Sequence, residues 1–390
     1  MFKNGAYYNG IGPWLKERFG MRISKVSIDG GFTCPNRDGT AGTGGCIFCS
    51  ELGSGDFAGT RIKDRTFADS SAASELSANR SSIASALSAD DASDTSDIPE
   101  TQTAHTPPFS KVSDTCRIAS EPRFFLRSVP PASEQMDAQI SVLKNKWQDF
   151  RCIAYFQNFT NTYAPVSILR EKYEEALKHP LCVGLAVATR PDCLDDAILD
   201  YLSELNQRTF LWVELGLQTS DEATAQYIRR GYPLSVYDDA VKKLTVRGIR
   251  IVTHLIAGLP GESKNIFLDS VRHIVSQDIF GVKLQLLHIM KHTDLAAKWL
   301  EEKDKDTDNS SFEPFVRPLE KEEYIDMIAD ALEIIPAGVT IHRLTGDAPK
   351  ETLLAPLWSR DKKSVLNGIN MELKRRSSCQ GDRALQRPDK

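Results

Sequence analysis

The chain has 390 residues, of which 41% are hydrophobic and 26% are charged, and its formal net charge is -5. This composition is typical of a soluble globular protein with one large core or two smaller ones. The negative charge argues against a strongly basic nucleic-acid binder, although a local basic patch is compatible with it. The N-terminal residues lack a signal-peptide pattern and no long apolar run occurs, so we expect a cytoplasmic protein that does not span a membrane.

The first predicted strand, residues 26–28, is followed by a glycine-rich loop that holds Cys34, Cys46 and Cys49 in the spacing C-x11-C-x2-C. Thiolates are soft ligands for zinc or iron–sulfur clusters, and glycines let the backbone fold tightly enough for the sulfurs to converge. A structural zinc site uses four protein ligands, and no histidine or fourth cysteine lies near this loop in sequence. Three thiolates therefore indicate a metal centre with one open position, which is either an iron–sulfur cluster or zinc.

The next segment changes in composition. From about residue 66 to residue 120 the sequence is rich in Ser, Ala, Asp and Thr and poor in aromatic residues. Such a segment cannot bury enough apolar area to offset the entropy of ordering it. We predict that residues 61–131 are a low-complexity, largely disordered insertion between an N-terminal segment with the cysteine loop, residues 1–60, and the rest of the fold.

After this segment, β-rich runs alternate with helical patterns. Strands that are apolar on both faces and alternate with amphipathic helices form a parallel sheet covered by helices. The predicted α/β fold is therefore a partial (β/α)6 TIM-like barrel, completed by residues 132–319, with a C-terminal α/β extension over residues 320–390 that adds a helix and a strand near residues 339–341. The predicted strands are residues 26–28, 152–156, 183–188, 211–217, 249–256 and 282–287.

Polar residues gather at or just after the ends of these strands. In βα barrels the carboxyl ends of the strands carry the catalytic face, and the cysteine loop also follows a strand, so we expect these residues to share one face with the thiols. The residues are Gln157, Asn158, Thr160, Asn161, Thr162, Thr189, Arg190, Asp192, Glu214, Gln218, His254, His288, Lys291 and His292.

Several motifs together resemble the YhcC-like radical S-adenosylmethionine (radical SAM) proteins: "RISKVSIDGGFTCPNRDGTAGTGGCIFC", "YFQNFTNTYAP", "VATRPDCL", "WVELGLQT", "THLIAGLPGE" and "HRLTGDAPKETLLAPLW". "TRPD", "VELGLQT" with the following "IRRG", and "GLPG" are also similar to the radical SAM domain of the Elongator catalytic subunit. The resemblance spans about residues 1–60 and 132–378. The cysteine spacing is longer than C-x3-C-x2-C, the commonest in that superfamily, and the low-complexity segment departs from the family pattern.

The resemblance implies a partial barrel of the radical SAM type, in which Cys34, Cys46 and Cys49 ligate a [4Fe-4S] cluster whose fourth iron binds SAM. It also implies reductive cleavage of SAM to a 5'-deoxyadenosyl radical, supplied with electrons by a donor such as flavodoxin or ferredoxin. The implied cofactor-binding residues are Phe48 beside the cluster or adenine, Gln157, Thr160, Asn161 and Thr162 at the methionine amino group, Arg190, Glu214 and Gln218 toward the ribose, and Gly258 at the adenine.

Each assignment has a structural alternative. Glu214 accepts from the ribose or from Arg190, or belongs to an ion pair within the barrel. "TRPD" binds the cofactor or only organises a turn, with Asp192 capping the next helix. His254 and His288 are candidate proton donors, or histidines that only satisfy hydrogen bonds in the core. The "GLPGE" turn cradles the adenine or merely starts a helix.

The substrate is not indicated by any motif. Similarity to the Elongator subunit, a tRNA-modifying protein, suggests RNA such as tRNA as the substrate, and Lys374, Arg375 and Arg376 supply a basic patch near the C-terminus. A small molecule or a protein is the alternative substrate, with residues 343–349 expected near it. Two other classes stay open: a non-catalytic iron–sulfur or zinc sensor, and a zinc-dependent barrel hydrolase.

Overall fold

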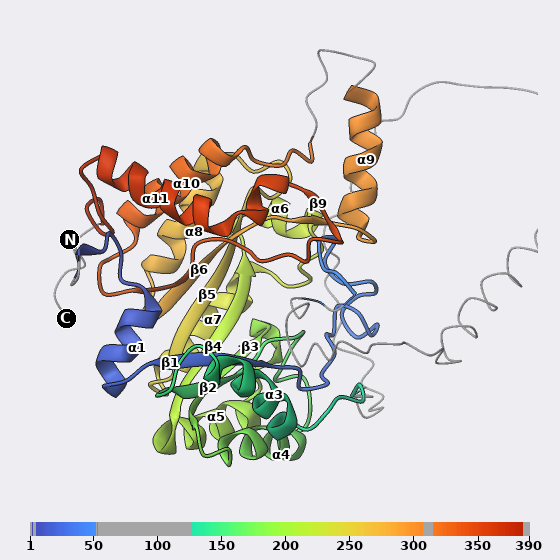
Figure 1. The fold of residues 1–390 in the computed structure, drawn as a ribbon. Helices are drawn as coiled ribbons and strands as arrows, with labels where there is room; N and C mark the ends of the chain where they lie inside the picture. The colour runs from blue at the N-terminus through green and yellow to red at the C-terminus, as the bar shows by residue number, and fades with distance from the viewer. Residues whose placement is uncertain (1, 3–4, 52, 54–125, 307–314, 385–390) are drawn as a thin grey trace, which may run out of the picture. The chain divides into compact units, whose positions relative to one another are not determined.

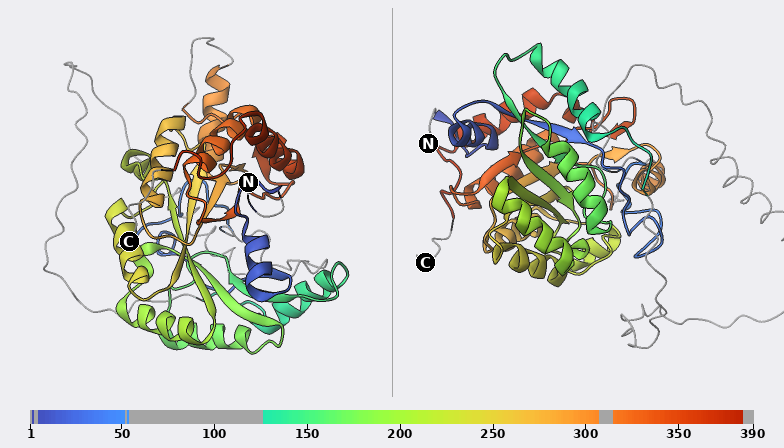
Figure 2. Two further views of the ribbon diagram at one scale, coloured as in Figure 1. Left: turned by 90° about the vertical axis from the view of Figure 1, so that its left-hand side faces the viewer. Right: turned by 90° about the horizontal axis from the view of Figure 1, so that it is seen from below.

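A curled sheet of seven parallel strands organises the part of the chain that the computed structural model describes, residues 2, 5–51, 53, 126–306 and 315–384 (Figures 1 and 2). The strands lie in the order β1-β2-β3-β4-β5-β6-β8. Their bounds are β1 Ile23–Ile28, β2 Arg151–Phe156, β3 Cys182–Thr189, β4 Phe210–Gln218, β5 Arg250–Ala257, β6 Gly281–Leu286 and β8 Thr340–Arg343. Most of the predicted insertion, residues 61–131, lies outside the described residues.

The predicted α/β half-barrel is confirmed, with one strand more than the six βα units. The additional strand, expected in the C-terminal extension, is β8. It pairs in parallel with β6, where Gly281 is the partner of Thr340, and so extends the same sheet. A short antiparallel pair, β7 (Ile289–Met290) and β9 (Leu353–Ala355), was not predicted.

Helices cover the outer face of the sheet (Figures 1 and 2). Asp195 and Ser263 begin two of them, since their side chains accept hydrogen bonds from the backbone N–H groups of Ile198 and Ile266. None of the described helices is long and apolar enough to cross a membrane. The helices are α1 Ile11–Phe19, α3 Ala132–Lys144, α4 Val166–Leu177, α5 Asp196–Arg208, α6 Glu222–Tyr227, α7 Leu234–Thr245, α8 Lys264–Val275, α9 Asp294–Asp306, α10 Lys321–Ile334 and α11 Lys362–Arg375, with short 3-10 turns η2 Pro191–Cys193 and η3 Leu357–Arg360.

The inner face of the sheet changes from apolar to polar along the strands. Near the amino ends of the strands, Ile23, Ile153 and Trp212 pack against Leu15 of α1 in a separate apolar cluster. Residues two positions apart on a strand share a face. The next inward positions are largely polar and come from six strands: Lys25, Tyr155, Glu214, His254, Lys283 and His342. Apolar side chains therefore fill the inside of the half-barrel near the amino ends of the strands, and titratable side chains line it farther toward the carboxyl ends.

The described residues on either side of the segment 54–125 meet at one aromatic ring. A Cβ atom on Gly53 would lie 3.2 Å from the ring of Phe159, and the Arg127 guanidinium carbon lies 4.6 Å from the centroid of the same ring. The Arg127 backbone N–H also donates to the carbonyl oxygen of Gly31, at 2.7 Å. Residues 126–131, which we predicted to belong to the insertion, therefore run beside the loop that follows β1.

Candidate functional site

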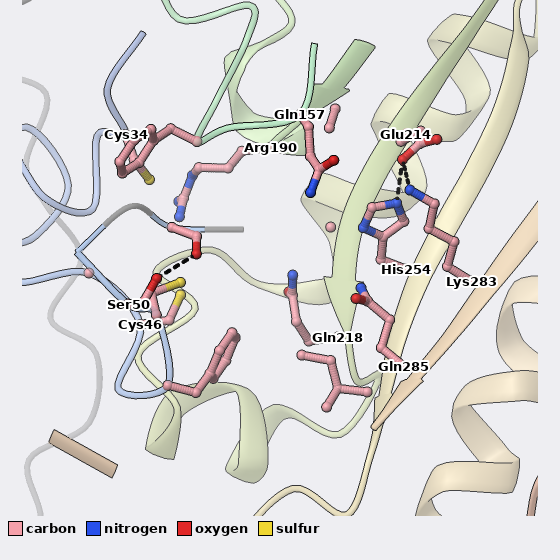
Figure 3. Close-up of a pocket in the computed structure, with 18 of the residues that line it drawn as sticks. Cys34, Cys46, Ser50, Gln157, Arg190, Glu214, Gln218, His254, Lys283 and Gln285 are labelled. Carbon is pink, nitrogen blue, oxygen red and sulfur yellow. Dashed lines mark hydrogen bonds and ion pairs between the residues drawn. The ribbon is translucent and has the colours of Figure 1, made fainter. Parts of the chain in front are cut away.

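A cavity of about 350 Å³ opens at the carboxyl ends of the strands (Figure 3). Its wall is built by the cysteine loop and by residues from, or directly after, all seven strands of the sheet. This volume is in the range of small-molecule sites. The sequence prediction that the thiols share a face with the polar strand ends agrees with this arrangement.

The cysteine loop is fixed by backbone hydrogen bonds. Gly44 and Gly45 adopt positive φ angles of 80° and 83°, which only glycine adopts without strain, just before Cys46. The Ile47 N–H donates to the carbonyl of Ile228 at 3.2 Å, and the Ile47 carbonyl accepts from Leu295 N–H at 2.9 Å. The loop is thereby tied to the segments after α6 and at the start of α9.

The three thiols line the cavity, and Cys34 and Cys46 lie together at one end of it (Figure 3). Asn36 Nδ2 donates to Cys46 Sγ at 3.6 Å and to the carbonyl of Arg229 at 2.6 Å. A hydrogen bond from Cys49, together with Arg190 and Asn36, lowers the pKa of Cys46 to about 7. The thiolate form that binds metal is thus favoured at Cys46.

This donor set fits an iron–sulfur cluster, since three soft thiols face the same cavity and cations lie beside them. Among the described residues, no three His, Cys, Asp or Glu side chains are grouped so as to hold a single metal ion. The thiols therefore share a wall of the cavity without forming a closed site for one ion.

Arg190 lies beside the thiols and is 8% exposed. Its Nε and Nη2 atoms donate to the two carboxylate oxygens of Asp192 at 2.9 and 2.6 Å, and Nη1 donates to the carbonyl of Arg230 at 2.9 Å. Arg190 therefore pairs with Asp192 and not with Glu214. The expectation that Asp192 caps the next helix is wrong, because Asp195 occupies that position.

The segment after β2 contributes only part of its predicted residues to the cavity. Gln157 and Thr160 line the cavity wall, and Gln157 Oε1 accepts from Ser27 Oγ at 3.1 Å. Asn161 is buried in the barrel wall, where its Nδ2 donates to the carbonyls of Phe156 and Ala188 at 3.1 and 2.8 Å. Thr162 Oγ1 donates to the carbonyl of Cys193 at 2.5 Å. Asn161 and Thr162 are thus engaged in holding neighbouring strand ends together.

Glu214 is fully buried at the opposite end of the cavity from the thiols and is surrounded by donors (Figure 3). Its Oε2 accepts from Tyr155 Oη at 2.7 Å, from His254 Nε2 at 2.8 Å and from Lys283 Nζ, and its Oε1 accepts from Trp212 Nε1 at 2.9 Å. Burial raises the pKa of the carboxyl, but Lys283 and His254 outweigh it and hold the pKa well below its usual value. Glu214 therefore forms an ion pair within the barrel, with Lys283, which is one of the alternatives that the sequence left open.

The two predicted histidines both line the cavity. Burial and the charge of Lys283 lower the pKa of His254 to about 4, although its contact with Glu214 acts in the opposite direction. Burial lowers the pKa of His288 to about 4, although Asp347 acts in the opposite direction more strongly than Arg343 acts in the same one. Both rings are thus neutral near pH 7, and neither is a strong proton donor in this state.

The remaining predicted cofactor residues divide between the cavity and the packed wall. Phe48 and Gln218 line the cavity, together with Arg343 and Asp347 of the segment 343–349. Gly258 is not among the lining residues. It has a φ of 84°, and a Cβ atom there would lie 2.9 Å from two side-chain atoms of Leu319, so its role in the structure is a close turn before α8.

Sequence reasoning missed Lys283 and Tyr155 on the cavity wall and the buried Arg230 near the thiols. Arg230 is 1% exposed and donates to the carbonyls of Leu217 and Thr219 at 3.2 and 2.6 Å. The alternation in "GVKLQL", in which Lys283 and Gln285 separate apolar residues, is the signal that could have placed Lys283 on the inner face.

The expected basic patch near the C-terminus is largely neutralised. Arg375 pairs with Glu372 at 2.6 Å. The side chain of Arg376 is 13% exposed and lies among the carboxylates of Asp326, Asp330 and Glu372. Of the three predicted cations, Lys374 is exposed and forms no ion pair among the described residues. Two of the three cations of the patch are therefore held in structural ion pairs, and the patch is not an extended basic surface.

Comparisons with known proteins decide the family. A model of the radical SAM superfamily matches residues 116–274, and a model of the radical SAM C-terminal domain matches residues 279–375. The protein YtqA of Bacillus subtilis (strain 168) is 38% identical over 378 residues, which cover 96% of this chain and 92% of YtqA. The chain belongs to the radical SAM superfamily. The YhcC protein of Escherichia coli (strain K12) is 30% identical over 355 residues, covering 91% of this radical SAM chain and 88% of YhcC, so the predicted resemblance is confirmed.

More distant relatives of this radical SAM protein cover less of the chain. A tRNA uridine(34) acetyltransferase of Dehalococcoides mccartyi (strain CBDB1) is 27% identical over 198 residues, or 50% of this chain and 39% of that protein. The structure of the archaeal Methanocaldococcus infernus Elp3 with an N-terminal deletion aligns with a TM-score of 0.54 at 19% identity, covering 64% of this chain and 60% of that one. This structural match supports the fold alone.

Proposed function

We propose that the protein is a radical SAM enzyme in which Cys34, Cys46 and Cys49 hold a [4Fe-4S] cluster and the adjoining cavity binds S-adenosylmethionine. The observation that carries this proposal is the shared cavity, which is lined by the three thiols and by the polar strand-end residues Gln157 and Gln218. A sensor would not need polar side chains from every strand of the sheet around its metal.

When bound, a reduced cluster would supply the electron that cleaves SAM to methionine and a 5'-deoxyadenosyl radical able to take a hydrogen atom from substrate. The residues of the chain would bind and orient the reactants. The thiols would be the cluster ligands, and the amides of Gln157 and Gln218 can donate to and accept from the polar atoms of SAM. The strand-end residues around the cavity would limit the access of water to the reacting atoms. A small electron-transfer protein such as flavodoxin or ferredoxin would supply electrons.

The test is anaerobic reconstitution with iron and sulfide, followed by reduction and addition of SAM. We expect cluster optical and EPR signals that change on adding SAM, and formation of 5'-deoxyadenosine. Cys46→Ser should lose both, whereas the matched control Cys379→Ser, a cysteine outside the cavity, should keep both. A colourless protein that binds stoichiometric zinc and leaves SAM intact would refute the proposal and favour a zinc sensor or a zinc-dependent hydrolase.

A tRNA is the substrate class that one comparison favours, through the match to a tRNA uridine(34) acetyltransferase. Binding of tRNA to this chain should then fall steeply as salt is added, because contacts with phosphates release counterions. Absence of binding to bulk tRNA in low salt would remove this substrate class and leave a small molecule or a protein. Arg375 and Arg376 are held in ion pairs, so Lys374 is the exposed cation of the predicted patch that is available to RNA.

A further inference from the structure

The end of the cavity remote from the thiols holds more positive than negative charge. Lys283 is 3% exposed, and its Nζ contacts Glu214 and the hydroxyl oxygen of Tyr155. Lys25 lies beside it on β1, with its Nζ 5.1 Å from the centroid of the Tyr155 ring. Lys25 forms no ion pair with a carboxylate among the described residues, so Glu214 is the carboxylate that acts on both lysines. Burial lowers the pKa of both amines, because each charged form lacks sufficient compensation by carboxylates or water.

A second shortage of negative charge lies at the end of β8. Asp347 accepts from Lys362 Nζ at 2.9 and 3.0 Å and also pairs with Arg343, whose Nη2 lies 3.3 Å from it. Asp347 and Arg343 both line the cavity. Lys283 and Arg343 line the cavity, and Lys25 and Lys362 lie behind them, so that these four cations share the two carboxylates Glu214 and Asp347.

The neighbouring histidines respond to this surplus. Lys283 and Arg343 each contribute to lowering the pKa of His254, after burial. Lys25 and Lys283 do the same for His342. At His288, which also lines the cavity, the charge of Asp347 outweighs that of Arg343. The effect of the lysines is therefore present at His254 and His342, on β5 and β8.

We propose that this end of the cavity, bounded by Lys283 and Arg343, binds an anionic group of the substrate, a carboxylate or a phosphate. Placing like charges together away from water is costly unless a counter-charge accompanies them. An oxyanion bound here would supply that charge, and a guanidinium can hold carboxylate or phosphate through two parallel hydrogen bonds. The inference rests on the proposed function, because it assigns the group to the substrate and leaves SAM at the thiol end.

The geometry separates this site from the thiol end. Figure 3 shows Cys34 and Cys46 on one side of the cavity and Glu214, His254 and Lys283 on the other, with Gln157 and Gln218 between them. Beside the thiols, Arg190 is paired with Asp192. Arg37 of the cysteine loop donates to the backbone carbonyls of Cys49 and Ser50, so its guanidinium is engaged at the thiol end. Lys283 and Arg343 are the cations that line the other end of the cavity.

The experiment measures thermal unfolding of the reconstituted full-length protein in inorganic phosphate, in succinate, and in sodium chloride at matched ionic strength, under anaerobic conditions. Binding to the native state raises the unfolding midpoint, and we expect a rise of about 2 °C with the preferred probe. Matched ionic strength removes general screening from the comparison. A larger effect of phosphate indicates a phosphorylated substrate, and a larger effect of succinate indicates a carboxylate.

The rise should fall by at least half in Arg343→Met and in Lys25→Met, and it should be kept in Lys363→Met, which removes an exposed cation of α11. Lys25→Met is the safer variant for folding, since Lys25 has no carboxylate partner among the described residues. An equal rise in all variants, or no rise in the wild type with either probe, would overturn the proposal. Formation of 5'-deoxyadenosine is measured on the same samples, so that loss of SAM cleavage with an intact anion effect would count against the proposed function alone.

Discussion

The Nζ atom of Lys283 lies 2.7 Å from the hydroxyl oxygen of Tyr155, although β6 and β2, which carry them, are separated by three strands in the sheet. Both groups also contact the same carboxylate oxygen of Glu214 on β4. The contact is formed across the concave inner face, because the sheet curls. Side chains of distant strands thereby cross-link the two halves of the half-barrel.

Removing one member of the pair Lys283–Glu214 should be strongly destabilising, because it leaves a buried charge without its partner. We expect Lys283→Met and Glu214→Gln each to lower the free energy of unfolding by about 3–5 kcal/mol, and the double variant to cost clearly less than the sum. Urea denaturation of the four proteins measures this coupling. Additive effects would mean that the two side chains do not depend on each other.

The pH dependence of stability should carry a contribution from His288. Its pKa is lowered to about 4 by burial, whereas an unfolded histidine titrates near 6.5. As the pH falls from about 6.5 to 4, the unfolded chain takes up a proton that the native ring refuses, so native stability falls.

In His288→Gln this contribution is absent. The stability advantage of the wild type over the variant should therefore shrink by about 2 kcal/mol between pH 7 and pH 4.5, in unfolding measurements on cluster-free protein. His254 is present in both proteins and cancels in the comparison. Parallel stability curves over this range would show that His288 is not kept neutral in the native state.

Gly258→Ala tests whether the turn before α8 serves the fold or the cofactor. A Cβ atom would meet Leu319 at 2.9 Å, and the φ of 84° is unfavourable for alanine, so we expect a loss of about 1–2 kcal/mol in unfolding free energy. Equilibrium binding of SAM to the reconstituted protein should be unchanged. Gly338→Ala is the matched control, since nothing lies within 4 Å of a Cβ atom there. Loss of SAM binding with unchanged stability would instead support the adenine-binding prediction.

Arg376 should be a stabilising residue of the C-terminal helix. Arg376→Met would remove the cation that Asp326, Asp330 and Glu372 share. Lys264 would still pair with Asp326 and Asp330, and Arg375 with Glu372, so we expect a cost of about 2 kcal/mol. Lys374 is exposed two residues earlier in the chain, so Lys374→Met should change the free energy of unfolding by less than about 0.5 kcal/mol. The comparison uses chemical denaturation at pH 7.

Acid should weaken the effect of Arg376→Met. Arg375 and Arg376 lower the pKa of Glu372 to about 2, so its stabilising charge is present above the unfolded value near 4.3 and is lost as the pH falls toward 2. The difference between wild type and Arg376→Met should therefore narrow below about pH 4. A difference that stays constant with pH would assign the cost to packing of the arginine side chain.

The fold could be predicted from sequence because its strands are apolar on both faces and alternate with amphipathic helices. Each of the six predicted strands overlaps an observed one within a few residues. The membership of β8 in the sheet could not be predicted, because its pairing with β6 depends on how far the sheet curls. Nothing in the four residues Thr340–Arg343 encodes that neighbour.

The sequence could predict at which face of the barrel the cavity lies, but not which side chains line it. The rule that polar residues at strand ends share one face correctly placed Gln157, Arg190 and Gln218 in the same cavity as the thiols. It could not predict that Gln157 lines the cavity while Asn161 does not. Asn161 is turned into the wall by the carbonyls of Phe156 and Ala188, which belong to separate strands. Lys283 was missed because a single lysine in a strand is usually solvated, and its partners lie at sequence separations of 128 and 69 residues.

The meeting of Gly53 and Arg127 at the ring of Phe159 has a consequence for how this chain can vary. Because both flanks of residues 54–125 are held at the same place, the number of residues between them does not alter the path of the chain into α3. Lengthening a loop between fixed ends adds only a small entropic cost, about 0.6 kcal/mol for each doubling. Related chains can therefore gain or lose whole stretches of sequence at this point while the half-barrel and its cavity keep their geometry.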